Sequence, residues 1–445
     1  MDKEIFMNLL QKREYKTVRN ILNVMNGVDI ATLMEMLKDK DLALAFRLIP
    51  KDKAAEVFAN MNKLMQSYLV EIFTQKELKE ILNEMFLDDT VDLLEDLPAD
   101  LVTRILVSVN PEKRRQINIL LKYPIDSAGS VMTTEYVDLR KSTTVAEALR
   151  HIKRTDIHKE TIYTCYILEN RKLVGTVSAK DLLTMDDSIT MAELMETEII
   201  TVTTHTDQEE VAKLFSKYDL LAIPVLDTDG MMVGIVTFDD AMDVLEEETT
   251  EDMALMSAIT PNAKSYFETS VLIHAKHRIM WLLLLMLSAT FTGLIIARYQ
   301  AIFQIIPLLM AFIPMLMDTG GNCGSQSSTL IIRGLALDEI HFSDIFRVMS
   351  KEFRISLIVG IGLAIANGAR LIIMHQNVDI AVIVACSLIG TIILSKMIGC
   401  TLPILAQKVN LDPAIMATPL ITTIVDTCST IIYFKIAELV FHLIF

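Results

Sequence analysis

The stretch AIMATPLITTIVDTCSTIIY, residues 414–433, places one carboxylate, Asp426, in the middle of a long hydrophobic segment. A charged side chain at membrane depth is energetically costly and persists only where it faces water, a cation or an opposite charge. A second hydrophobic segment is interrupted by PMLMDTGGNCGSQSS, residues 314–328, which carries Asp318 and several uncharged polar side chains. Two such interruptions predict a polar path through a bilayer, and a cation is its simplest occupant.

The hydrophobic segments that could span a membrane lie in the C-terminal part of the chain. Each of the five is compatible with a span of about 20 residues: about 279–297, 303–332, 355–375, 380–405 and 414–444. We expect the second to be interrupted at Pro307, Pro314 and the Gly320-Gly321 pair, and the fifth at Pro419. Such breaks are tolerated where the freed backbone faces protein or a water-filled cavity.

Charge is distributed unevenly along the chain. Residues 276–445 contain 9 acidic and 11 basic side chains, whereas residues 1–275 contain 48 acidic and 30 basic ones, a balance of −18. An acidic half of this kind disfavours nucleic acid and favours divalent cations. Lys and Arg, such as Lys276 and Arg333, gather at one set of span ends. This bias predicts a multi-pass plasma-membrane protein with the acidic part in the cytoplasm and the C-terminus outside.

Residues 1–127 have the pattern of short helices joined by polar turns. An imperfect repeat relates RLIPKDKAAEVF, residues 47–58, to EDLPADLVTRIL, residues 95–106. Each Pro-x-Asp step predicts a helix start, with proline near the first helical position and an acid in the first turn. Stacked helices of this kind predict a small superhelical domain.

Residues 128–250 contain a clearer duplication. LVGTVSAKDLL, residues 173–183, is repeated as MVGIVTFDDAM, residues 232–242, and each copy predicts the order β-α-β-β-α. The pattern resembles a tandem pair of CBS domains, at residues 128–190 and 191–250. In nucleotide-binding CBS domains, the hydroxyl and the carboxylate of this motif hold ribose and phosphate. The resemblance therefore implies a possible ATP site, and the matching residues are Ser178, Asp181, Thr237 and Asp240. The sequence leaves ATP binding open.

The whole chain resembles the MgtE family of magnesium channels. The resemblance rests on PMLMDTGGNCGSQSSTLIIRGLA, residues 314–336, and on the order of the segments. That order is a helical N-domain, a CBS pair, a connecting helical region at 251–278 and five spans at 279–445. The resemblance implies a multidomain fold that combines an α-helical domain, an α/β domain pair and membrane α-helices. It also implies a homodimer in the lipid bilayer with the pore on its two-fold axis. It also implies that Asp426 of both subunits binds the hydrated ion, with help from Thr418, Thr422 and Asn322.

Acidic residues also cluster in the cytoplasmic half. Asp88 and Asp92, like Asp239 and Asp243, are four residues apart, so each pair shares one helix face. Like charges at that spacing repel each other, and cations between two such faces relieve the repulsion. The family resemblance implies Mg²⁺ sensor sites between the N-domain and the CBS pair. Its implied ligands are Asp88, Asp92, Asp207, Glu209, Asp219, Asp240, Asp243, Glu248, Glu251 and Asp252.

Other functions are compatible with parts of this pattern. A secondary carrier for divalent cations would use the same spans, but these show no inverted repeat. A cation sensor without transport would not need a polar fifth span. An intramembrane aspartic protease would pair Asp318 with Asp426, although Asp-Thr-Gly in aspartic proteases lies on a β-loop. We therefore expect a Mg²⁺ channel gated by cytosolic Mg²⁺, and no enzyme. The sequence does not rank Mg²⁺ against Mn²⁺, Co²⁺ or Ca²⁺.

Three charged residues in the spans have no role in this interpretation. Lys435 and Glu438 are three residues apart and are expected either to pair with each other or to extend to the membrane interface. Lys396, in the fourth span, is expected to reach the cytoplasmic surface.

Overall fold

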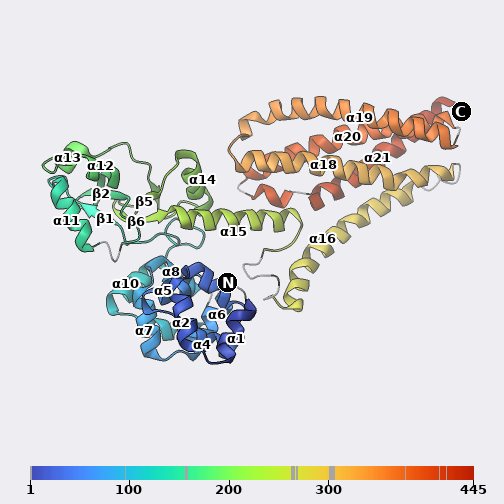
Figure 1. Ribbon diagram of the computed structural model, residues 1–445. Helices are drawn as coiled ribbons and strands as arrows, with labels where there is room; N and C mark the ends of the chain where they lie inside the picture. Colours follow the sequence, from blue (N-terminus) through green and yellow to red (C-terminus); the bar gives the residue numbers. More distant parts are fainter. Residues whose placement is uncertain are drawn as a thin grey trace. The chain divides into compact units, whose positions relative to one another are not determined.

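The structure is a computed structural model that describes residues 3–95, 97–155, 159–261, 266, 269–299, 306–375, 377–409, 411–416 and 418–444. It divides into two compact units, Met1–Leu245 and Glu246–Phe445. Figure 1 draws the first unit in blue and green and most of the second in yellow to red. Each unit is described below by itself.

Short helices form the first part of unit one, as predicted. Their bounds are α1 Lys3–Gln11, α2 Tyr15–Val24, α3 Gly27–Met34, α4 Asp39–Phe46, α5 Lys51–Ala59, α6 Lys63–Ile72, α7 Gln75–Glu84, α8 Leu87–Glu95, α9 Ala99–Ser108 and α10 Pro111–Leu120. Helices two apart in sequence pack together, α3 on α5, α5 on α7 and α7 on α9. Since each helix is too short to bury its apolar face alone, this stacking is what makes one continuous core.

The repeated Pro-x-Asp steps start helices, as the sequence predicts. Pro50 precedes α5 and Pro98 precedes α9, and each helix has an aspartate, Asp52 or Asp100, in its first turn. Each proline is the N-cap residue, directly before the first helical residue, so the expected position near the helix start is confirmed. An acid in the first turn interacts favourably with the unpaired N–H groups there.

The second part of unit one contains two three-stranded sheets, one per copy of the duplication. The first copy has β1 Val137–Leu139, α11 Val145–Thr155, β2 Thr164–Glu169, β3 Lys172–Ser178 and α12 Ala179–Thr184, followed by α13 Met191–Leu194. The second has β4 Val202–Thr203, α14 Gln208–Tyr218, β5 Ala222–Leu226, β6 Met232–Thr237 and α15 Phe238–Met256. In both sheets the first pair of strands is parallel and the second antiparallel. The predicted order is confirmed.

The two copies exchange their leading segments. Thr133, which precedes the first sheet, pairs with Ile235 of β6, and Glu196, which precedes the second sheet, pairs with Thr176 of β3. Each copy therefore completes the sheet edge of the other. This reciprocal pairing brings the segment after Thr133 next to the start of α15.

The second unit consists mainly of long helices. They are α16 Val271–Arg298, α18 Ile313–Ala336, α19 Ile345–His375, α20 Val378–Lys408 and α21 Thr418–Ile444, with the 3₁₀ turns η2 Pro307–Phe312, η3 Phe342–Asp344 and η4 Pro413–Met416. Four helices in the described residues are long and apolar enough to cross a membrane: α16, α19, α20 and α21. The expected count of five is not confirmed, because the polar residues of α18 keep its hydropathy below that of a span.

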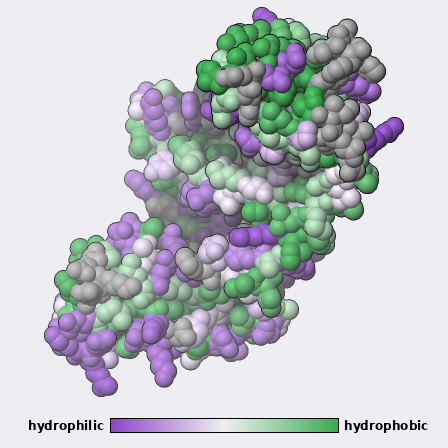
Figure 2. Space-filling model, turned by 90° about the vertical axis from the view of Figure 1, so that its right-hand side faces the viewer, coloured by the Kyte–Doolittle hydropathy of each residue, from purple (hydrophilic) through white to green (hydrophobic). Residues whose placement is uncertain are grey.

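The surface of this unit is apolar on the outside. Residues of α16 such as Leu282, Met286 and Leu294 are largely exposed. Figure 2 shows hydrophobic side chains gathered at the surface of the part drawn at the top, while the surface at the lower left is mostly hydrophilic. An exposed apolar surface of this extent requires lipid or protein against it.

The expected breaks at Pro307 and Pro314 are confirmed, since residues 307–312 form a 3₁₀ turn and α18 begins at Ile313, whereas the break expected at Gly320-Gly321 is wrong. α18 is a continuous helix of 24 residues that runs through Gly320 and Gly321. Pro419 is the second residue of α21 and therefore marks a helix start, where the missing proline N–H leaves no backbone bond unmade. The 3₁₀ turns before α18 and α21 are the irregular backbone of these segments.

Candidate ion path and acidic cluster

Asp426 lies on α21 in a partly buried position. Its backbone carbonyl accepts a hydrogen bond of 2.7 Å from the Thr430 hydroxyl. Its carboxylate has no hydrogen-bond or ion-pair partner within the described residues. A carboxylate in this environment needs water or a cation to interact with.

α18 presents a polar face beside α21. Asp318, Asn322 and Gln326 follow one another at four-residue spacing, so they share one side of the helix, and all three are exposed in the single chain. Asp318 and Asp426 are close enough for their charges to repel each other. Because a row of polar side chains is unfavourable against lipid, this face requires protein or water opposite it.

The glycines of α18 bring the two helices together. A side chain at Gly321 would collide with Thr422 on α21, and one at Gly320 would collide with Val425 of α21 and Thr391 of α20. The small residues therefore serve close helix packing. They do not provide the irregular backbone that the sequence suggested.

The threonines of α21 bond mainly to their own helix. The hydroxyls of Thr422 and Thr423 both donate to the Pro419 carbonyl at 2.9 Å. Their remaining lone pairs can still accept hydrogen bonds from an ion's water. The side chain of Thr418, the first residue of α21, lies outside the described residues.

A cluster of carboxylates lies where the helical N-domain meets the CBS pair. We call it the acidic cluster and define it as Asp88, Asp89, Glu135, Glu160, Asp239 and Asp240. The α8 backbone N–H of Leu87 donates to the Glu135 carboxylate at 3.2 Å, which ties the two domains together. The backbone N–H of Glu160 donates to the Glu135 carbonyl at 2.8 Å. Asp240 accepts a bond of 2.6 Å from Thr237, the last residue of β6.

Burial raises the pKa of four carboxyl groups of the acidic cluster. It raises the pKa of Asp89 to about 6, and the charge of Asp240 adds to the effect. Burial is also the main cause of the raised pKa of Asp88, Asp240 and Glu160, with mutual repulsion second. One carboxylate oxygen of Glu160 is buried without a hydrogen-bond partner among the described residues. Among the described residues, the acidic cluster therefore carries more negative than positive charge.

Lys113 supplies one fixed cation near the acidic cluster. It is buried, and its Nζ donates to the carbonyls of Leu82 and Met85 at the end of α7. Burial lowers the pKa of Lys113, while the charges of Glu135 and Asp88 oppose that shift. One ammonium group held by backbone carbonyls does not balance several carboxylates.

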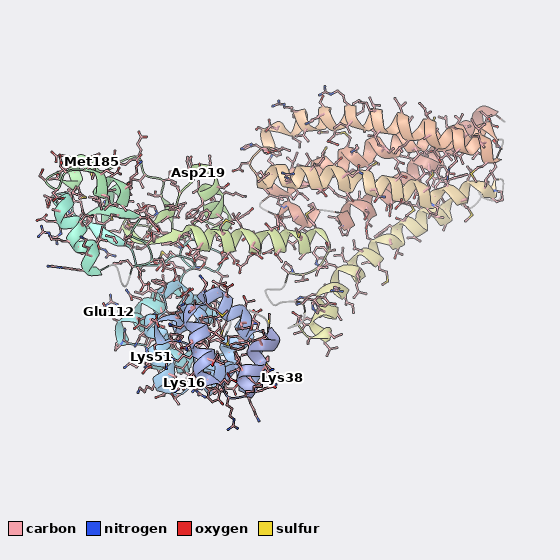
Figure 3. The ribbon with its side chains drawn as sticks, in the orientation of Figure 1. Lys16, Lys38, Lys51, Glu112, Met185 and Asp219 are labelled. Atoms are coloured by element: carbon pink, nitrogen blue, oxygen red, sulfur yellow. The ribbon has the colours of Figure 1, made fainter. Side chains whose placement is uncertain are left out.

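The structure brings together only some of the predicted metal ligands. Asp88 and Asp240 meet in the acidic cluster, whereas Asp92 is exposed and pairs with Lys63 at 2.9 Å. The other predicted acids lie elsewhere: Asp207 at the N-cap of α14, Glu209 paired with Lys213 at 2.8 Å, Asp219 at the left-handed end of α14 (Figure 3), and Asp243, Glu248, Glu251 and Asp252 along α15. No group of three or more His, Cys, Asp or Glu in the described residues is arranged as a metal site.

Five members of this environment were not predicted as site residues: Asp89, Lys113, Glu135, Glu160 and Asp239. The signal for Glu135 was available in the duplication, because it follows the segment that pairs with the opposite copy. Nothing in the sequence near Glu160 or Lys113 indicated their positions.

The two candidate nucleotide motifs have the same local geometry but different surroundings. Ser178 donates to Asp181 at 2.6 Å, just as Thr237 donates to Asp240 at 2.6 Å. Asp240 belongs to the acidic cluster, which repels a phosphate. Asp181 does not belong to it.

Family profiles match most of the chain. The profile described as "Divalent cation transporter" matches residues 313–436, the "MgtE intracellular N domain" matches 25–126, and the "CBS domain" matches 128–187 and 191–247. The protein named magnesium transporter MgtE of Thermus thermophilus is 33% identical over 97% of this chain and 96% of its own length. This chain belongs to the MgtE family.

Other members of the MgtE family support the same assignment. The magnesium transporter MgtE of Bacillus subtilis is 32% identical over 98% of this chain and 96% of its own length. The crystal structure of the cytosolic domain of the Mg²⁺ channel MgtE in complex with ATP aligns with a TM-score of 0.52 and 35% identity. It covers 55% of this chain and all of that one. The predicted family is confirmed, and the N-domain and CBS pair correspond to the cytosolic domain of that relative.

The raised pKa values predict how the packing of α8 against the CBS pair depends on pH. When α8 packs against the CBS pair, the raised pKa values of Asp88, Asp89 and Asp240 let these carboxyl groups keep protons at a pH where they would otherwise be ionised. When α8 moves away, the pKa values return to near their ordinary values and the protons are lost. Packing is therefore favoured at low pH and weakened as the pH rises through about 6 to 8. Mg²⁺ should restore it at pH 8. Hydrogen exchange of α8 in the full-length protein, without and with Mg²⁺, measures both effects.

A matched control is available in the helical N-domain, which also contains α8. Asp240→Asn should flatten the pH response, whereas Glu112→Gln should leave it unchanged, because Glu112 is exposed in the first turn of α10 (Figure 3). Equal α8 protection at pH 6 and pH 8 without divalent cations would contradict the role assigned to the acidic cluster.

Proposed function

We propose that this protein is a Mg²⁺ channel of the plasma membrane, with an ion path lined by α18 and α21. The observation that carries the proposal is the Asp426 carboxylate, which has no protein partner among the described residues. The polar face of Asp318, Asn322 and Gln326 supports it. The names of the full-length relatives, all magnesium transporters, point to the same cargo.

A hydrated ion suits this path better than a dehydrated one. Mg²⁺ demands oxygen ligands at about 2.0–2.1 Å and gives up its water reluctantly. Carboxylates and threonine hydroxyls can bind the water shell, and divalent charge then selects against Na⁺ and K⁺. Entry would follow the membrane potential, which is worth about 4.6 kcal/mol for a divalent ion at 100 mV.

A homodimer completes the path in this proposal. The polar face of α18 is exposed in the single chain and is unfavourable against lipid. A two-fold axis beside α18 and α21 would cover that face and place one Asp426 from each subunit across the pore. The positive-inside bias puts residues 1–278 in the cytoplasm and the C-terminus outside.

The alternatives are distinguished by observation and experiment. A carrier for divalent cations would use the same residues but saturate at low flux. A protease using Asp318 and Asp426 is disfavoured because Asp-Thr-Gly lies inside the continuous helix α18. The family profiles and full-length relatives are those of transporters.

The first test replaces the pore carboxylate. Asp426→Ala should reduce Mg²⁺ flux into proteoliposomes by about a hundredfold, since a removed charge of this kind is worth a few kcal/mol. Asp426→Asn should keep a water-binding oxygen but lose the preference for divalent over monovalent cations. Wild-type flux from a well-folded Asp426→Ala protein would exclude Asp426 as the selectivity residue.

Cytosolic Mg²⁺ is the proposed gating signal. The acidic cluster needs protons or cations for α8 and the CBS pair to stay packed, and carboxylate oxygens suit Mg²⁺. Asp240 lies at the start of α15, the helix that leads toward the membrane helices in sequence. High cytosolic Mg²⁺ would hold the cytosolic part compact and the pore closed. The acids along α15 (Asp243, Glu248, Glu251 and Asp252), with Asp92, Asp207, Glu209 and Asp219, are proposed as further ligands.

The gate is tested by flux against internal Mg²⁺. Wild-type flux should fall as internal Mg²⁺ rises through the millimolar range, about where weak carboxylate sites fill. The triple variant Asp88→Asn, Glu160→Gln, Asp240→Asn should lose that dependence, and Glu112→Gln should keep it. Wild-type flux that is independent of internal Mg²⁺ would refute the gate but not the channel.

ATP is proposed to bind at Ser178 and Asp181, the motif outside the acidic cluster. The ATP complex of the related cytosolic domain supports a nucleotide site in the CBS pair. Calorimetry with ATP should show weaker binding for Asp181→Ala and little change for Asp240→Ala. The opposite order would move the site to Thr237 and Asp240. No heat of binding at millimolar ATP would remove ATP from the proposal.

A further inference from the structure

A charged network lies buried among three helices of the membrane unit. It consists of Ser327 on α18, Glu352 on α19 and Lys396 on α20, and each of the three residues is no more than 7% exposed. The Lys396 ammonium was expected to reach the cytoplasmic surface, and that expectation is wrong. Instead the ammonium lies inside the helix bundle.

The three side chains form a closed set of contacts. Lys396 Nζ donates to Ser327 Oγ at 3.0 Å, and Ser327 Oγ donates to Glu352 Oε2 at 2.7 Å. The ammonium and the carboxylate are 3.6 Å apart. The serine hydroxyl therefore joins both charges, and each helix contributes one member.

The network fixes the side of α18 that faces away from the polar face. Ser327 is nine residues after Asp318, so at about 100° per residue the two side chains leave the helix on opposite sides. Ser395 of α20 donates to the Gly320 carbonyl on the same side, and Gly399 of α20 lies directly against Gly324. Rotation of α18 would break all of these contacts together.

We propose that Glu352, Ser327 and Lys396 are positioning residues that hold the rotation of α18. In holding it, they determine that Asp318, Asn322 and Gln326 are presented to the ion path. Glu352 also neutralises Lys396, whose charge would otherwise oppose a cation in the same unit. The effect on transport rests on the proposed function, whereas the rotation itself does not.

The test is a double-mutant cycle with a second readout. Glu352→Gln and Lys396→Met should each lower Mg²⁺ flux by at least about tenfold, because each leaves a buried charge unpaired. The double variant should lose less than either single variant, since neither charge then remains.

The readout for rotation is the reaction of Asn322→Cys with a hydrophilic thiol reagent, in a protein whose exposed Cys386 is replaced by Ala. That reaction should be fast in the parent and at least about fivefold slower with Glu352→Gln, whereas loss of stability alone would increase local opening and make the reaction faster.

The matched control is the exposed pair on α21. Lys435 and Glu438 are 2.9 Å apart with side chains 63% and 43% exposed, as the sequence predicted for a pair three residues apart. Lys435→Met and Glu438→Gln should leave flux and Asn322→Cys reactivity unchanged. Additive losses in the Glu352/Lys396 cycle, or unchanged thiol reactivity, would overturn the proposal.

The outcomes separate this inference from the proposed function. If the wild-type protein carries no Mg²⁺, the channel is refuted, and the thiol reaction still tests the rotation of α18. If the single variants do not fold, the double variant decides. A folded double variant supports the pairing, and an unfolded one overturns it.

Discussion

A charge held away from water without a fixed partner requires a proton, a cation or an opposite charge, and this requirement governs both units of the chain. In the membrane unit, Asp426 lacks a protein partner among the described residues. In the cytosolic unit, the acidic cluster contains more carboxylates than Lys113 can balance. The Glu352–Lys396 pair is the third solution, in which the protein supplies the opposite charge itself. Mg²⁺ is a suitable partner where the protein supplies none.

α18 takes part both in the ion path and in the buried charge pair, because its two sides carry different residues. One side carries Gly320 and Gly324, which pack against α20 and α21, and Ser327, which hydrogen-bonds to the buried Glu352. The other side carries Asp318, Asn322 and Gln326 and is exposed in the single chain. The hydropathy of α18 is therefore lower than that of an ordinary membrane-spanning helix, yet its close packing keeps it a continuous helix. Its small residues permit the close approach that aims its polar residues.

Much of the fold could be predicted because it depends on local patterns. The CBS duplication repeats its strand order with a clear motif, and the Pro-x-Asp steps start helices as expected. The continuous α18 could not be predicted from its glycines. Gly320-Gly321 disfavours a helix by local propensity, but packing against Thr391, Val425 and Thr422 outweighs that cost.

The sequence by itself determined the domain order, the membrane character of the second half and the presence of Asp426 in a hydrophobic segment. These follow from composition and short-range periodicity, which do not depend on distant contacts. Only the tertiary structure decided which acids meet. It joins Asp88 to Glu135, Glu160 and Asp240, leaves Asp92 with Lys63, and buries Lys396 against Glu352. The physical reason is that a charge's role depends on its burial and on its neighbours in space, and both are set by packing between segments far apart in the chain.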